Sequence, residues 1–137
     1  MAGVAISAAG RVGEVPPEAV SARNEPEDPA LFGIDQLYFA NFSCFGAEID
    51  AIAPGVGVIA PVPERHGFDT PYAALDGTSM ASPIATGTLA RALAKRDDYK
   101  SMARDIHRAN MARAVLTDLC ATIGLASDYE GDGMVVE

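Results

Sequence analysis

The stretch Leu75–Pro83, with the sequence LDGTSMASP, decides how this chain is interpreted. A short apolar run comes before a tight turn at Gly77, and Ser79 then opens a run of small and apolar residues with helical spacing. The pattern predicts a strand, a turn and a helix at about residues 79–95 that is buried on nearly all sides. Pro83 would lie in the first turns of that helix, where a missing N–H is tolerated.

Two interpretations compete for Ser79 at the start of this helix. The first N–H groups of a helix have no acceptor within it, and the positive end of the helix dipole favours negative charge nearby. An acyl-transfer nucleophile needs such a place, with a hydroxyl that attacks and an N–H that holds the oxyanion. The alternative is a capping role for Ser79 and Ser82, since Ser and Thr at a helix start are most often caps.

Three sequence words, in order along the chain, resemble the subtilisin-like serine peptidases, or subtilases. Gly77–Pro83 (GTSMASP) resembles the nucleophile motif G-T-S-M-A-x-P of that family. Phe42–Val56 (FSCFGAEIDAIAPGV) resembles its F-S-x-x-G…D-v-x-A-P-G-V stretch, and Tyr129–Val135 (YEGDGMV) resembles its closing element Y-G-x-G-x-V, with Glu130 as one extra residue. The resemblance covers residues 3–136, but it matches only the later part of a subtilase domain.

The resemblance implies that Ser79 is the catalytic nucleophile of a serine endopeptidase that works through an acyl-enzyme. The Ser79 backbone N–H and the Thr78 hydroxyl would contribute to the oxyanion hole. Asp76, Gly77 and Met80 would lie beside the site, and oxidation of Met80 would put a polar group into it.

The catalytic order in the family is Asp, His, Ser, with an Asn before the Ser as an oxyanion donor. Residues 1–137 contain no match to the D-T/S-G word of the acid or the H-G-T word of the base. We therefore expect this chain alone to be inactive, and we expect the Asp and His to come from an upstream segment on the same gene or from a companion chain. The other partner would be a peptide or protein substrate.

The segment Val4–Arg11 has two registers against the family. Ala8–Arg11 (AAGR) can be aligned with the family's A-A-G-N element, with Arg11 in place of the oxyanion Asn. In the register we prefer, Val4–Gly10 is the next strand, the family's V-i-A-V-G-A stretch, and the Asn would precede Met1. In either register no residue of this chain supplies that donor.

Neither histidine is expected to act as the base. His66 lies in a charged loop, and His107 stands beside Arg108 on an amphipathic helical stretch. By the resemblance neither lies where the base belongs, so we expect both to be solvated. Ile84 stands where many subtilases carry a His that is not the base, and we attribute this difference to helix packing.

The predicted fold class is α/β, as the C-terminal part of a subtilisin-like fold with a largely parallel sheet, a buried nucleophile-bearing helix and covering C-terminal helices. A second helical region at about 99–123 would cover the sheet and stop at Gly124. Residues 1–137 would form one partial peptidase domain with an acidic, proline-rich and poorly ordered surface loop at about 13–35. Strands are expected near residues 3–9, 38–45, 49–53 and 56–62, with a short one at 72–75.

Composition argues against two classes of partner. The chain has 10 basic and 19 acidic residues, a formal charge of −9, which argues against binding nucleic acid or an anionic membrane surface. No apolar run approaches the roughly 20 residues of a membrane span, and the N-terminal stretch lacks the charged region of a signal peptide. The cellular compartment is therefore unknown.

Cys44 and Cys120 fit neither a C-x-x-C pair nor a zinc-type spacing. Two buried free thiols are expected, and whether they pair is left open. No cofactor is expected; the family allows structural calcium, for which the sequence identifies no ligands.

Two other function classes stand beside the peptidase. One is a non-catalytic remnant or a binding module derived from a subtilase. The other is an unrelated α/β binding domain whose helix start is merely capped.

Overall fold

The protein is described by a computed structural model that covers residues 3–63 and 70–136. Its main element is a five-stranded sheet with the order β2-β1-β3-β7-β6. The three central strands run parallel, and β2 and β6 pair antiparallel at the two edges. The predicted α/β fold with a largely parallel sheet is therefore confirmed. The strands are β1 (Ile6–Arg11), β2 (Leu37–Phe39), β3 (Ala51–Pro54), β6 (Cys120–Ala121) and β7 (Met134–Val135).

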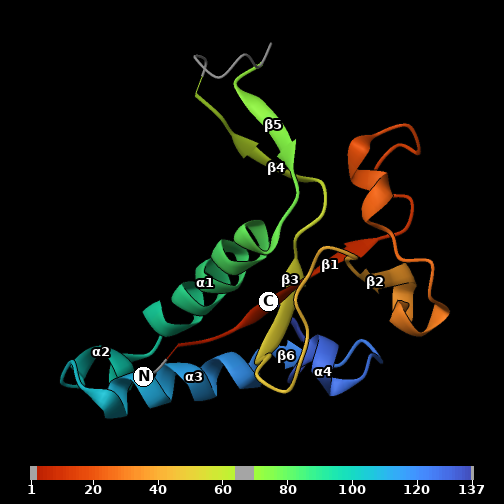
Figure 1. Cartoon of the computed structure of the whole chain (residues 1–137). Coiled ribbons are helices and arrows are strands. Elements are labelled where there is room, and N and C mark those ends of the chain that lie inside the picture. Colours follow the sequence, from red (N-terminus) through yellow and green to blue (C-terminus); the bar gives the residue numbers. More distant parts are fainter. Residues whose placement is uncertain (1–2, 64–69, 137) are drawn as a thin grey trace.

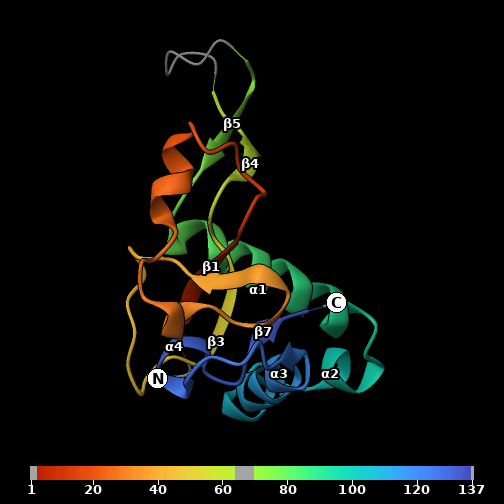
Figure 2. The same ribbon diagram turned by 90° about the vertical axis from the view of Figure 1, so that its right-hand side faces the viewer.

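Four helices accompany this sheet in the described part of the chain. The longest, α1, lies along β1 and β3, and α3 packs beside α1 (Figure 1). Two further strands form an antiparallel hairpin between β3 and α1, and both views show it extending away from the sheet (Figure 2). These elements are β4 (Val58–Pro61), β5 (Tyr72–Leu75), α1 (Thr78–Ala94), α2 (Asp97–Ser101), α3 (Ile106–Asp118) and α4 (Ser127–Glu130).

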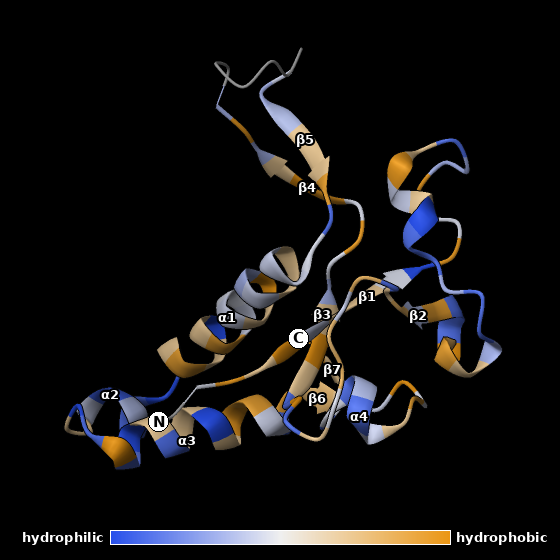
Figure 3. Cartoon of the chain, in the orientation of Figure 1, coloured by the Kyte–Doolittle hydropathy of each residue, from blue (hydrophilic) through white to orange (hydrophobic). Residues whose placement is uncertain are grey.

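Alternating side chains of β1 and β3 divide the core between the two faces of the sheet. Ala8 and Ala53 belong to the cluster that contains Ala81 of α1, so small residues meet where the helix crosses the strands. Ala9 and Ile52 belong to the cluster on the opposite side. In Figure 3 β3 is coloured as hydrophobic, whereas the short α2 is largely hydrophilic.

Only one face of α1 is buried among the described residues. Ala81, Ala85 and Leu93 are buried, whereas the opposite face, including Pro83 and Gly87, is exposed. The expectation of burial on nearly all sides is wrong for this chain, because β1, β3 and α3 pack against one side of the helix only.

The helical region predicted at 99–123 is two helices and a strand. Asp105 starts α3 as its N-cap, where its carboxylate accepts the His107 and Arg108 amides at 2.9 and 3.2 Å. The helix ends at Asp118, because the chain next pairs with β7 as β6. Gly124, with φ +88°, therefore follows a strand and does not stop a helix.

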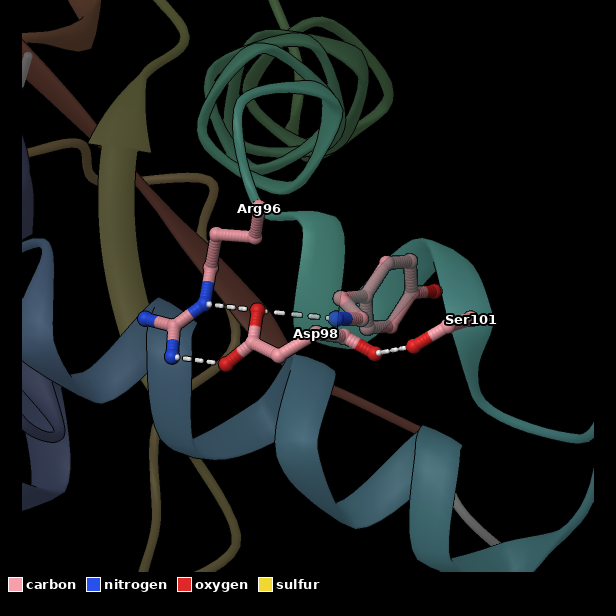
Figure 4. Close-up of polar contacts among 4 residues, drawn as sticks. Arg96, Asp98 and Ser101 are labelled. Atoms are coloured by element: carbon pink, nitrogen blue, oxygen red, sulfur yellow. Dashed lines mark hydrogen bonds and ion pairs between the residues drawn. The ribbon is translucent and has the colours of Figure 1, made fainter.

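An exposed ion pair lies at the start of α2, where Arg96 is the N-cap residue. The Arg96 guanidinium donates to both carboxylate oxygens of Asp98, at 3.3 and 2.9 Å (Figure 4). Asp98 also accepts the Tyr99 amide, and its carbonyl accepts the Ser101 hydroxyl. The Arg96 bond holds the pKa of Asp98 below its ordinary value.

The strand predicted at 38–45 is much shorter, because the chain turns after Phe39. The Ser43 amide closes this turn on the Ala40 carbonyl at 2.9 Å, and the buried Ser43 hydroxyl accepts the Ala8 amide at 3.0 Å. Cys44 therefore lies on the surface, which corrects the expectation of two buried thiols. Cys120 is half-buried, and both cysteines are free.

The acidic segment 13–35 contains short 3-10 helices rather than one open loop. They span Val20–Asn24 and Pro29–Leu31, with a third at Ile34–Gln36. Between residues 18 and 30 only Ser21 and Pro26 are buried. Most of residues 18–30 therefore lie at the surface, and the low order of the segment stays a prediction.

Candidate active site

The turn that carries Ser79 is bound to the end of the sheet. The Gly77 amide donates to the Gly55 carbonyl at 2.8 Å, and the Gly55 amide donates to the Ala9 carbonyl at 2.8 Å. Two of the motifs singled out in the sequence, A-P-G and G-T-S, therefore meet through their backbones. This contact fixes the start of α1 against β1 and β3.

Glycine is required at both ends of this contact. A Cβ on Gly55 would lie 2.7 Å from the Ala8 Cβ and 2.9 Å from the Gly77 carbonyl oxygen. Gly77 has φ +148°, where side-chain-bearing residues are strained, and a Cβ there would lie 2.9 Å from the Ser79 Oγ. The Ser79 hydroxyl thus occupies the space that a side chain at Gly77 would need.

Ser79 is exposed as the second residue of α1, and its hydroxyl has no hydrogen-bond partner among the described residues. No side chain caps the helix start at Gly77. The Met80 and Ala81 amides both donate to the Gly77 carbonyl, at 2.9 and 3.3 Å, whereas the Ser79 amide has no acceptor in the described part of the chain. This arrangement favours the nucleophile interpretation over the capping one, because the hydroxyl and the N–H both remain available.

Thr78 and Met80, the neighbours of Ser79, are half-buried at the same helix start. Thr78 is the first residue of α1, so its hydroxyl stands in the same turn as the Ser79 amide. Their roles, as an oxyanion donor and as a residue beside the site, stay predictions.

Asp76 is held by two hydrogen bonds. Its Oδ1 accepts the Gly57 amide at 2.7 Å, and its Oδ2 accepts the Ser21 hydroxyl at 2.9 Å. Both carboxylate oxygens are therefore engaged with groups other than Ser79. Sequence reasoning placed Asp76 beside the site and did not find Ser21, for which the sequence offers no signal.

Tyr38 lies near several negatively charged side chains, two of which, Glu14 and Glu25, belong to the acidic segment. Burial, together with the smaller effect of the negative charges of Glu25, Asp76 and Glu14, raises the pKa of Tyr38 to about 12. The Tyr38 ring lies under β1, since a Cβ on Gly10 would meet its Cζ and hydroxyl oxygen at 2.4 Å. The tyrosine thus stays neutral at physiological pH.

The two histidines are not brought to Ser79 by the described residues. His66 lies outside them. His107 is in the first turn of α3, whose other end packs against the carboxyl-terminal half of α1 in a groove that includes Thr88 and Val115. Ser79 lies at the amino end of α1, a helix about 25 Å long, so His107 is remote from it.

Arg11 is the last residue of β1 and pairs with Glu14 at 3.7 Å. The segment Val4–Gly10 runs into the centre of the sheet, which agrees with the register in which it is a strand. The preferred register, in which Arg11 does not replace the oxyanion Asn, stays a prediction.

The extra residue of the closing element has a structural role. Glu130 is buried, with 5% of its surface exposed. Its carboxylate accepts the Thr122 hydroxyl and the Ile123 amide, at 2.5 and 2.8 Å. The insertion relative to the family pattern thus provides acceptors for the loop that follows β6.

Comparison with known proteins agrees with this geometry. The model of the subtilase family matches residues 19–130, which contain both Gly55 and the Ser79 turn. The chain belongs to the subtilase family. This assignment confirms the resemblance found in its sequence.

Individual subtilases show the same similarity. The chain is 35% identical over 96 residues to subtilisin DY of Bacillus licheniformis, which covers 70% of this chain and 30% of that protein. It is 34% identical over 98 residues to halolysin of Haloferax mediterranei, covering 70% of this chain and 16% of halolysin. A halolysin-like extracellular serine protease of Natrialba magadii is 36% identical over 96 residues, covering 70% and 15%. The chain thus matches less than a third of the length of these curated relatives.

Within residues 3–63 and 70–136, no group of three or more His, Cys, Asp or Glu side chains is arranged to hold a metal ion. No helix in the same ranges is long and apolar enough to cross a membrane.

Proposed function

We propose that this subtilase chain is the nucleophile-bearing part of a serine endopeptidase domain, with Ser79 as the nucleophile. The observation that carries the proposal is the Ser79 hydroxyl at the start of α1: neither it nor the neighbouring Ser79 amide has a hydrogen-bond partner among residues 3–63 and 70–136. A hydroxyl that served only as a cap would be bonded to a backbone N–H of the first turn. The sequence motif and the family membership support the same role.

The proposed reaction is acyl transfer. The Ser79 Oγ bonds to the carbonyl carbon of the peptide while its proton passes to a histidine base. The Ser79 N–H, together with the Thr78 hydroxyl, donates to the oxyanion that forms. The carbon–nitrogen bond then breaks as the base returns the proton to the leaving amine, which leaves an ester on Ser79. Water hydrolyses this ester and restores the hydroxyl.

The base and its orienting Asp enter this proposal from a segment other than residues 1–137. No described residue offers a base to Ser79, and the family words for the acid and base have no match in this sequence. A serine hydroxyl is a weak nucleophile without an adjacent base, so the chain alone would be inactive. No cofactor and no calcium ion enters the proposed reaction.

The absence of the family's acid and base motifs from residues 1–137 also favours a second candidate, a non-catalytic subtilase remnant that binds a partner. The two candidates differ in one experiment. The chain would be combined with an upstream subtilase segment that carries the Asp and His, and the release of a chromophore from a peptide substrate would be measured.

The peptidase proposal predicts turnover that Ser79→Ala abolishes while Ser82→Ala, on the same helix turn, retains it. Turnover that survives Ser79→Ala would contradict the assignment, and its absence in both wild type and variants would favour the remnant.

A further inference from the structure

One carboxylate connects three segments of this chain at the nucleophile turn. Asp76 precedes Gly77 directly, its Oδ1 accepts the Gly57 amide at 2.7 Å, and its Oδ2 accepts the Ser21 hydroxyl at 2.9 Å. Ser21 lies in the 3-10 helix Val20–Asn24 and has only 8% of its surface exposed. The acidic segment is thereby bonded to the residue that introduces the nucleophile motif.

The Gly57 bond is one half of a reciprocal pair. In one direction the Gly77 amide donates to the Gly55 carbonyl, and in the other the Gly57 amide donates to the Asp76 carboxylate. Gly57 has φ +66°, and a Cβ there would lie 2.6 Å from a methyl group of Val15. Asp76 therefore lies where three segments meet: the β3–β4 connection at Gly57, the turn before α1, and the acidic segment at Val15 and Ser21.

The Gly77 carbonyl then orients the helix start. It accepts the Met80 and Ala81 amides, so its direction sets where the first turn of α1 begins. Ser79 lies inside this turn, with its Oγ close over Gly77. A change in the Asp76 bonds would move the Gly77 peptide and, with it, the hydroxyl and N–H of Ser79.

We infer that Asp76 is a positioning residue for the Ser79 nucleophile, and that Ser21 makes the acidic segment part of that support. The inference rests on the proposed function of Ser79. Hydrogen-bond geometry is required here rather than charge. An Asn amide at this position supplies an acceptor for the Gly57 N–H and a donor for the Ser21 hydroxyl oxygen. Asp76→Asn should therefore preserve what Asp76→Ala removes.

The first arm of the test measures amide hydrogen exchange by NMR in the 137-residue chain. Asp76→Ala should accelerate exchange of the Gly57 and Gly77 amides about tenfold or more, as loss of a bond to a charged group implies. Asp76→Asn should restore slow exchange, and Ser21→Ala should give an intermediate effect. Glu18→Ala, which removes an exposed carboxylate from the same segment, is the matched control and should change neither amide.

The second arm measures the rate at which a fluorophosphonate acylates Ser79 when an upstream segment supplies the acid and base. Asp76→Ala should slow the first-order acylation step about tenfold with little change in the half-saturating probe concentration, and Asp76→Asn should restore it. The measurement is made at a temperature where every variant is folded. If Asp76 only stabilised the fold, Asp76→Ala would not slow acylation selectively, and Asp76→Asn would have no lost rate to restore.

Normal acylation by Asp76→Ala, or unchanged exchange at Gly77, would overturn the inference. A wild-type preparation that is never labelled would instead contradict the proposed function of Ser79 and remove the inference with it.

Discussion

The Gly77 amide nitrogen lies 2.8 Å from the Gly55 carbonyl oxygen, and this bond joins two segments that are far apart in the sequence. Gly55 directly follows the last residue of β3, and Gly77 directly precedes α1. The bond places the Gly77 carbonyl oxygen so close to Gly55 that a side chain at Gly55 would not fit, whereas Gly77 itself needs glycine because of its φ of +148°.

Gly55→Ala should destabilise the protein by about 1–3 kcal/mol, because its Cβ would meet the Ala8 Cβ and a backbone oxygen, neither of which can rotate away. The matched control is Gly87→Ala on α1, where a Cβ meets nothing within 4 Å. Gly87→Ala should stabilise the helix by up to about 1 kcal/mol. Urea denaturation of the two variants measures both effects, and equal midpoints would contradict the close approach at Gly55.

Glu130→Ala should lower the free energy of unfolding by about 1–3 kcal/mol, since it leaves the Ile123 amide without its buried acceptor. Asp128→Ala removes an exposed carboxylate from the same helix, α4, and should change stability by less than about 0.5 kcal/mol. Thermal denaturation followed by circular dichroism compares them. A larger loss in Asp128→Ala would show that charge on α4, and not the buried acceptor, is what matters.

Cys120 should react with iodoacetamide much more slowly than Cys44 at pH 8. Burial, with a smaller effect of Asp132, raises the pKa of Cys120 to about 11, so little thiolate is present at pH 8. Cys44 is exposed. Mass spectrometry after timed alkylation distinguishes the two sites, and in urea the difference should disappear. Equal rates in the folded chain would contradict the burial of Cys120.

The fold and the nucleophile turn could largely be predicted from the sequence, because local patterns determine them. The alternating small residues of β1 and β3 and the glycine before Ser79 each constrain the backbone at their own position. The break before α3 was missed because Asp105 acts as a cap only through its bonds to the amides of the next turn. Helical spacing continues on both sides of it and hides the interruption.

Contacts between distant segments were the other class of feature that the sequence did not reveal. The bond from Ser21 to Asp76 spans 55 positions and follows no motif, and Ser21 lies in a segment whose composition indicated only a surface loop. The burial of Glu130 could not be predicted either, since an extra residue in a family motif does not show which backbone amide its carboxylate will bind. Such contacts depend on which distant segments meet when the chain folds, so they are visible only in the structure.

The central claim is that Ser79 is a nucleophile that requires an acid and a base from outside residues 1–137. The most direct measurement is covalent labelling by a fluorophosphonate, mapped by mass spectrometry, for this chain alone and after co-expression with an upstream segment that carries the Asp and His. The account predicts no labelling of the chain alone and labelling at Ser79 in the combination. Robust labelling of the isolated chain that His66→Ala abolishes, or labelling of the combination at a residue other than Ser79, would contradict it.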